Sequence, residues 1–160
     1  EIYALAAEHA KTRAVLFLGR HAGFPIALEG ALKLKELAYI HAEGFAAGEL
    51  KHGPIALIEE VQPVFVIVPS PRGRDSLHSK VVSNIQEIRA RGAITIVIAE
   101  EGDTAVEDYA NHVIRIPKAP TLMQPLLATV PLQIFAAHVA KSKGYDVDQP
   151  RNLAKSVTVE

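Results

Sequence analysis

Charged side chains recur at helical spacing within residues 26–41. Glu29, Lys33 and Glu36 are four and then three residues apart, so a helix brings them to one face. A carboxylate beside an ammonium stays ionised, and inside a pocket it can serve as a general base. The alternative is an exposed face with ordinary Glu–Lys pairs, each worth a few tenths of a kcal/mol. Spacing alone favours this second interpretation, since charge runs are usually solvated.

His52 and Lys155 are two further candidates for chemistry. His52 lies between a lysine and a Gly-Pro turn, and an imidazole can transfer protons near neutral pH. Lys155 has apolar neighbours, and desolvation of its amine would make it a nucleophile toward a carbonyl. By pattern alone, both are more easily explained as surface residues. The seven histidines include no His-x-x-x-His pair, so no metal site is expected.

The bulk composition describes an ordinary globular chain. Its 160 residues are 49% hydrophobic and 22% charged, with a net charge of −1, which fits one domain. The spread of Lys and Arg argues against nucleic-acid or anionic-membrane partners. There is no cysteine, which excludes disulfides and thiolate chemistry and suits a cytoplasmic location. No apolar run is long enough to span a membrane, and the first segment does not have the pattern of a signal peptide. The first residue is Glu1, so we expect a fragment of a longer chain.

Apolar runs alternate with helical patterns along the chain. Helices are predicted at residues 1–12, 26–41, 79–91 and 123–142, and strands at 14–19, 64–68, 93–99 and 112–116. Three of these strands are almost entirely apolar, which is typical of parallel strands covered on both faces. The sequence therefore predicts an α/β fold, a three-layer α/β/α sandwich with a mostly parallel, flavodoxin-like sheet.

The predicted sheet also indicates where ligands should bind. In such folds, ligands bind beyond the carboxyl ends of the strands. Those positions are occupied by the segments from Arg20 onward, 70–76 and 100–104. The segment after the first strand precedes a helix, as an anion site requires, but it is not a P-loop. Residues 146–160 are polar, which is typical of a frayed tail, but a few apolar residues could anchor them.

Three strings resemble the glucosamine-6-phosphate synthase family, also called glutamine–fructose-6-phosphate aminotransferases. They are residues 27–36 (ALEGALKLKE), 47–54 (AGELKHGP) and 148–160 (DQPRNLAKSVTVE). The first string is shared more loosely among sugar isomerase (SIS) proteins, and the last is far more specific. The resemblance covers essentially the whole of residues 1–160 and corresponds to the second of two SIS domains, ending at what looks like the natural C-terminus.

The resemblance implies that this enzyme makes glucosamine 6-phosphate and glutamate from fructose 6-phosphate and glutamine. It implies that His52 assists opening of the sugar ring, that Lys155 forms a Schiff base at C2, and that Glu36 moves the proton between C1 and C2. Glu29, Lys33 and Arg151 would support the substrate site, and the tail 146–160 would contribute to it. No metal or organic cofactor is implied.

The resemblance also implies partners. They are the first SIS domain, the glutaminase domain and a second subunit, since the family's histidine acts across a dimer interface. Two alternatives stay open: a non-catalytic SIS module that binds a phosphosugar for regulation, and another SIS phosphosugar isomerase.

The chain by itself should be nearly inactive as a synthase, because it lacks the first SIS domain with its phosphate loop. Formation of glucosamine 6-phosphate from fructose 6-phosphate and ammonia measures this directly. Robust turnover by residues 1–160 alone would refute the expectation.

Overall fold

The computed structural model describes residues 1–72 and 77–153. Its sheet has five parallel strands in the order β2-β1-β3-β4-β5. The strands are β1 (Ala14–Gly19), β2 (His41–Ala46), β3 (Pro63–Ile67), β4 (Ile94–Glu100) and β5 (His112–Ile116). This is the order of flavodoxin-like folds, whose chain reverses direction across the sheet between β1 and β3. The predicted sandwich and the parallel sheet are confirmed.

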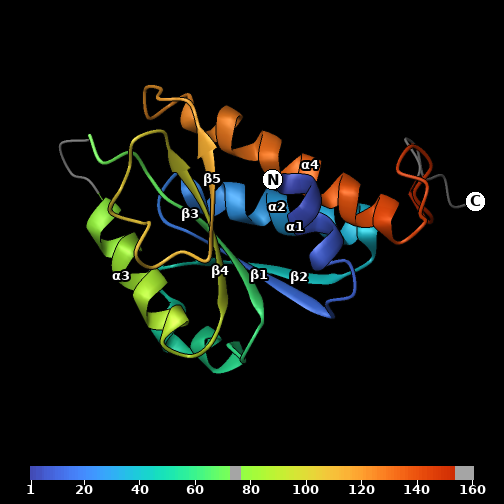
Figure 1. Ribbon diagram of the computed structural model, residues 1–160, viewed down its shortest axis with the longest axis horizontal. Helices are drawn as coiled ribbons and strands as arrows, with labels where there is room; N and C mark the ends of the chain where they lie inside the picture. Colours follow the sequence, from blue (N-terminus) through green and yellow to red (C-terminus); the bar gives the residue numbers. More distant parts are fainter. Residues whose placement is uncertain (73–76, 154–160) are drawn as a thin grey trace, which may run out of the picture.

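Helices cover both faces of the sheet. One face carries α1 (Ile2–Glu8), α2 (Gly23–Ala38) and α4 (Gln124–Ser142), and the other carries α3 (His78–Arg89) with the short 3-10 turns η1 (Leu50–His52) and η2 (Pro54–Leu57) (Figure 1). Two hydrophobic cores result, one on each side of the sheet. Every residue of β3 is buried, which explains why its sequence is continuously apolar.

Strand β2 was not predicted, because the helical pattern was extended through residue 41. The structure ends α2 at Ala38 and places Tyr39 in a left-handed conformation, with φ 55° and ψ 37°. β2 then begins at His41 and forms an edge of the sheet beside β1. Its residues, HAEGFA, include no β-branched side chain, so the strand has little sequence signal of its own. It exists because it pairs with β1.

Helix α2 lies unusually close to its neighbours. A Cβ on Gly30 would stand 2.8 Å from Leu132 Cδ1 in α4 and 2.9 Å from Phe17 Cδ1 in β1. A Cβ on Gly44 of β2 would stand 2.9 Å from the backbone of α2. The predicted apolar face of α2 is confirmed, with Ala27, Ala31 and Leu34 buried. These contacts determine which side of α2 faces solvent.

The described residues contain no helix that is long and apolar enough to cross a membrane. Buried polar groups are few, and among them His9 is exceptional. Its side chain is 7% exposed, and within the described residues its Nε2 has no hydrogen-bond partner. Burial lowers the pKa of His9 below 6.5, an effect that Glu8 opposes and His112 reinforces. A histidine buried in this way favours its neutral form, because the folded chain resists its protonation.

We expect His9 to make the fold acid-sensitive. Below pH 6.5 the unfolded chain binds a proton that the folded chain resists, so the free energy of unfolding should fall as the pH decreases from 6.5 through the lowered pKa. His9→Leu should reduce this slope and leave stability at pH 7.5 equal or higher, because an unsatisfied nitrogen is removed. Urea unfolding at pH 5 to 7.5 measures both. The half-buried His138→Leu serves as the control, and an unchanged slope in His9→Leu would contradict the assignment.

Candidate functional site

The charged residues of α2 form one connected group. Lys33 Nζ lies 2.7 Å from Glu36 Oε2 and 3.5 Å from Glu29 Oε1. The Lys33 and Glu36 side chains are each only 26% exposed, so they are less solvated than the spacing alone suggested. The hydrogen bond to Glu36 is the main reason that the pKa of Lys33 is raised, and burial only partly opposes it. Lys33 therefore remains a cation between two carboxylates.

Glu36 lies in an open groove at the end of α2. One wall is the segment that leaves the helix, with Lys35, Glu36, Tyr39, Ile40 and His41. The other wall is Arg151, Asn152 and Leu153, which belong to the part of the chain that resembled a frayed tail. The backbone N–H of Arg151 donates a hydrogen bond of 2.8 Å to the Tyr39 hydroxyl. The structure thus brings Arg151 next to the helix end that carries Glu36.

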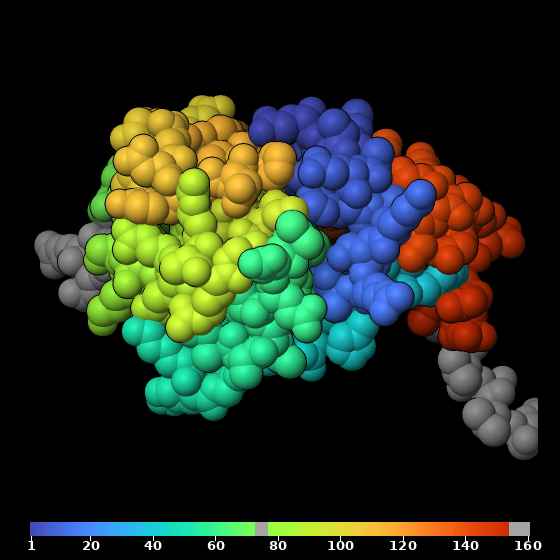
Figure 2. Space-filling model, turned by 60° about the horizontal axis from the view of Figure 1, so that its bottom comes forward, coloured from blue at the N-terminus to red at the C-terminus, as the bar shows by residue number. Residues whose placement is uncertain are grey.

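Of the predicted site residues, His52 is not brought to this groove. Lys155 lies outside the described residues. His52 ends η1, its side chain is 71% exposed, and its Nδ1 is 3.1 Å from Glu49 Oε2. η1 belongs to the face of the sheet that carries α3, where Lys51 pairs with Glu87 at 2.7 Å. Figure 2 shows this teal segment well away from the red C-terminal segment. Within one chain, His52 and Glu36 are therefore on opposite sides of the sheet.

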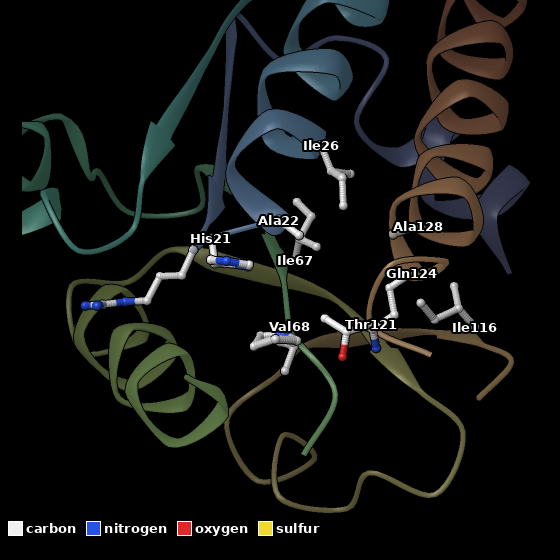
Figure 3. A pocket seen from close by; sticks show the side chains of 12 residues that line it. His21, Ala22, Ile26, Ile67, Val68, Ile116, Thr121, Gln124 and Ala128 are labelled. Carbon is white, nitrogen blue, oxygen red and sulfur yellow. The ribbon is translucent and has the colours of Figure 1, made fainter. Parts of the chain in front are cut away.

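A second pocket occupies the position where this fold usually binds ligands. It lies beyond β1 and β3, next to the first turn of α2 and the start of α4 (Figure 3). Its volume is about 30 Å³, which is little more than the space of a water molecule. Its walls are mostly apolar, with Ile26, Ile67 and Ala128 among the lining residues. The pocket is therefore narrow and mostly apolar, with few polar groups for a sugar phosphate.

A carboxylate of the chain itself accepts several hydrogen bonds at this edge. Glu100, at the end of β4, is 2% exposed. It accepts hydrogen bonds from Ser70 Oγ at 3.0 Å, Arg72 at 3.0 Å and Gln124 Nε2 at 2.8 Å. Burial raises the pKa of Glu100, but these bonds and one from the Ala119 backbone outweigh it and lower the pKa below 4.5. The segments 70–76 and 100–104 were predicted as binding positions, and the described part of them forms an internal ion pair.

Two residues of these sites, Tyr39 and Gln124, were not among the candidates from the sequence, whereas Glu100 lies in the predicted segment 100–104. Tyr39 lies within the helix predicted at residues 26–41. Glu100 and Gln124 become partners only when β4 and α4 meet. The position of Glu100 directly after a buried strand was the one available signal. Among the described residues, no group of three or more potential ligands could hold a metal ion.

Comparison with known proteins gives matches over nearly the whole chain. A model of the SIS domain matches residues 9–142. A glutamine–fructose-6-phosphate aminotransferase (isomerizing) of Corynebacterium diphtheriae is 83% identical over 160 residues, which are 100% of this chain and 26% of that protein. The enzyme of the same name from Streptomyces coelicolor is 75% identical over 156 residues, 98% of this chain and 25% of that protein. The chain thus spans about a quarter of the length of these curated relatives.

Solved structures agree with the fold. The C-terminal domain of glucosamine-fructose-6-phosphate aminotransferase from Francisella tularensis has a TM-score of 0.82 and 41% identity, covering 92% of this chain and 41% of that one. Tagatose-6-phosphate ketose/aldose isomerase from Escherichia coli has a TM-score of 0.71 and 24% identity, covering 85% and 38%. The second similarity concerns the fold alone.

Glu100 should stabilise the carboxyl edge of the sheet. Glu100→Gln removes the charge that Arg72 and Ser70 surround, and we expect the free energy of unfolding to fall by about 2 kcal/mol at neutral pH. Because the folded pKa is lowered, the contribution of the carboxylate is present above pH 4.5 and is lost as the pH falls below it.

The two proteins should therefore converge in acid, which urea unfolding at pH 7 and pH 3.5 tests. Glu101→Gln, the exposed neighbour, is the matched control and should change little. Equal stability of Glu100→Gln and the parent chain at pH 7 would contradict this account.

Proposed function

The chain belongs to the SIS domain family, and on this basis we propose that it is the second sugar isomerase domain of a glutamine–fructose-6-phosphate aminotransferase. That enzyme converts fructose 6-phosphate and glutamine to glucosamine 6-phosphate and glutamate. The observation that carries the proposal is 83% identity over the full 160 residues to a relative of that name. The charged group of α2 and the groove beside it supply the matching chemistry.

The proposed reaction has three steps. His52 moves a proton from the anomeric hydroxyl to the ring oxygen, which opens the ring and exposes the C2 carbonyl. The neutral Lys155 amine attacks C2 and releases water, and ammonia then displaces the lysine from the resulting imine. Glu36 removes a proton from C1 and returns it to C2, while the C1 hydroxyl proton passes to the imine nitrogen, so that C1 becomes the aldehyde and C2 bears the amine.

The geometry around Glu36 supports its role as the base. Lys33 holds a positive charge 2.7 Å from its carboxylate, which favours the ionised form that can accept a proton. The pair is half-buried rather than fully solvated, so the interaction is screened less than on an open surface. Glu29 binds the other side of the same ammonium at 3.5 Å and so fixes its position.

The groove also supports a role for the C-terminal segment. Arg151, Asn152 and Leu153 form the wall opposite Glu36. Lys155 follows Leu153 by two residues, so covalent geometry keeps the two Cα atoms within about 7.6 Å of each other. We therefore assign Lys155 to the same site as the proposed base. Arg151 contributes a second positive charge in this region.

Other parts of the reaction are assigned to the rest of the longer protein. The relatives are about four times as long as this chain, and the chain has no cysteine to release ammonia from glutamine. At the carboxyl edge of its own sheet, Glu100 already accepts hydrogen bonds from Ser70, Arg72 and Gln124. We assign the glutaminase step and the phosphate grip to the remaining three quarters.

His52 is assigned to the site of a second subunit. It lies on the α3 side of the sheet and is exposed, so it is free to reach an adjacent chain. A homodimer with two-fold symmetry would then exchange one histidine each way. Each complete site would contain Glu36 of one subunit and His52 of the other.

Substitutions in the full-length enzyme test both assignments. Glu36→Gln should lower the rate of glucosamine 6-phosphate formation by about 10²- to 10⁴-fold, because the base is lost. His52→Ala should also lower the rate strongly. Glu59→Gln, an exposed residue outside the groove, is the control. Unchanged activity in Glu36→Gln would favour a non-catalytic phosphosugar-binding module instead.

A mixture of the two inactive variants locates the histidine. After subunit exchange, half of the dimers are mixed, and one site in each mixed dimer has both Glu36 and His52. Activity should therefore return to about one quarter of the wild-type value. If His52 serves its own subunit, mixing restores nothing, and the assignment across the interface fails.

A further inference from the structure

We propose that Tyr39 is a positioning residue that fastens the C-terminal segment 145–153 beside Glu36. The inference rests on the proposed function of the groove, and it adds a residue that the reaction chemistry does not name. Three observations carry it: the backbone conformation of Tyr39, the contacts of its side chain, and its place relative to Glu36.

The backbone of Tyr39 has an unusual conformation. Tyr39 follows the last residue of α2 and has φ 55° and ψ 37°, the left-handed region in which glycine is the usual residue. A bulky side chain there costs free energy, because Cβ crowds the carbonyl oxygen. Local structure alone would select glycine or asparagine at this position. Such an outlier is a reason to look for a task of the side chain.

The side chain of Tyr39 makes contacts that offset the free-energy cost of its left-handed conformation. Its hydroxyl accepts the hydrogen bond from the Arg151 backbone N–H at 2.8 Å, joining residues 112 positions apart. The Arg151 guanidinium lies 4.1 Å from the centroid of the Tyr39 ring, within the range of cation–π attraction. The ring of Tyr145 packs on it at a centroid distance of 4.8 Å. One aromatic side chain thus holds the C-terminal segment at two points, just after α4 and just before the last described residues.

The place of Tyr39 explains what this anchoring achieves. Tyr39 is three residues after Glu36, which is nearly one helical turn, and both line the same groove. The segment is therefore attached to the helix that carries the proposed base. Asn152, the next residue after the anchored Arg151, has φ 62°, a conformation that asparagine tolerates. It turns the chain immediately after the anchor, at the groove wall.

This arrangement separates positioning from substrate binding. Lys155 and Glu36 must act on adjacent carbons of one substrate, so their relative position affects the chemical steps. Loosening the anchor leaves phosphate binding intact, because we assign that binding to another part of the protein. The effect of Tyr39 should therefore appear in kcat far more than in KM. If Tyr39 contributed only to stability, its loss would not affect kcat more than KM.

The first experiment follows the anchor itself in the full-length enzyme. Tyr39→Phe removes the hydroxyl and keeps the ring, so the Arg151 amide should exchange with deuterium about five- to tenfold faster, as expected for loss of one hydrogen bond. Tyr109→Phe, a tyrosine that packs against the opposite core, is the matched control and should leave this amide unchanged. An unchanged exchange rate in Tyr39→Phe overturns the proposal without reference to catalysis.

The second experiment follows the chemistry. Tyr39→Gly removes the anchor and also relieves the left-handed strain, so α2 should remain folded while kcat falls about a hundredfold. Tyr39→Phe should retain most of the activity lost in Tyr39→Gly, because the ring contacts with Arg151 and Tyr145 persist. Both variants should keep KM for fructose 6-phosphate within about threefold of wild type, because the grip on substrate is elsewhere.

Borohydride trapping with fructose 6-phosphate tests the proposed function and the role of Tyr39 separately. In the wild-type enzyme it should label Lys155, and labelling should be at least tenfold slower in Tyr39→Gly. If the wild-type enzyme is not labelled, the proposed function fails, whereas amide exchange still judges the anchor. If wild type and Tyr39→Gly are labelled at the same rate, Tyr39 does not position the lysine, and the present proposal is wrong.

Discussion

The close packing of α2 against the parallel sheet is the constraint on which the rest of the site depends. Gly30 and Gly44 allow the helix to approach β1, β2 and α4 so closely that a methyl group at either position would collide with its neighbours. Such contacts determine the rotation of the helix about its axis. With Ala27, Ala31 and Leu34 buried, Glu29, Lys33 and Glu36 must lie on the outer face. A helix packed less tightly could rotate, and its charged group would have no defined direction.

The end of the same helix connects the site to the C-terminus. α2 stops where Tyr39 adopts a left-handed conformation, and this turn both begins β2 and presents the tyrosine ring to the segment after α4. The contacts of that ring with Arg151 and Tyr145 make an otherwise polar tail part of a groove. A single helix thus supplies the proposed base, its cationic partner and the attachment point for the C-terminal segment 145–153.

The carboxyl edge of the sheet has a different role from the one that the fold predicts. Its topological switch point lies between β1 and β3, yet the cavity there is small and Glu100 uses the nearby donors. The buried carboxylate satisfies Arg72 and Gln124, which stabilises the edge and leaves fewer donors for a ligand. The Glu100 interactions at this edge and the exposed His52 on the opposite face support the proposal that the domain contributes catalytic side chains to a composite site. This fits the proposal that the phosphate is bound by another part of the longer protein.

The sequence by itself determined the layers of the fold and the family. Continuous apolar runs predicted the buried parallel strands, helical spacing predicted the charged face of α2, and three strings pointed to the SIS family, because these signals are local in the chain. Tertiary structure alone decided the rest. β2 forms by pairing with β1, Glu100 meets Arg72 and Gln124 only when three separate segments converge, and Tyr39 meets Arg151 across 112 positions. Such contacts depend on how the elements pack, and residue spacing along one element carries no information about a partner that lies far away in the chain.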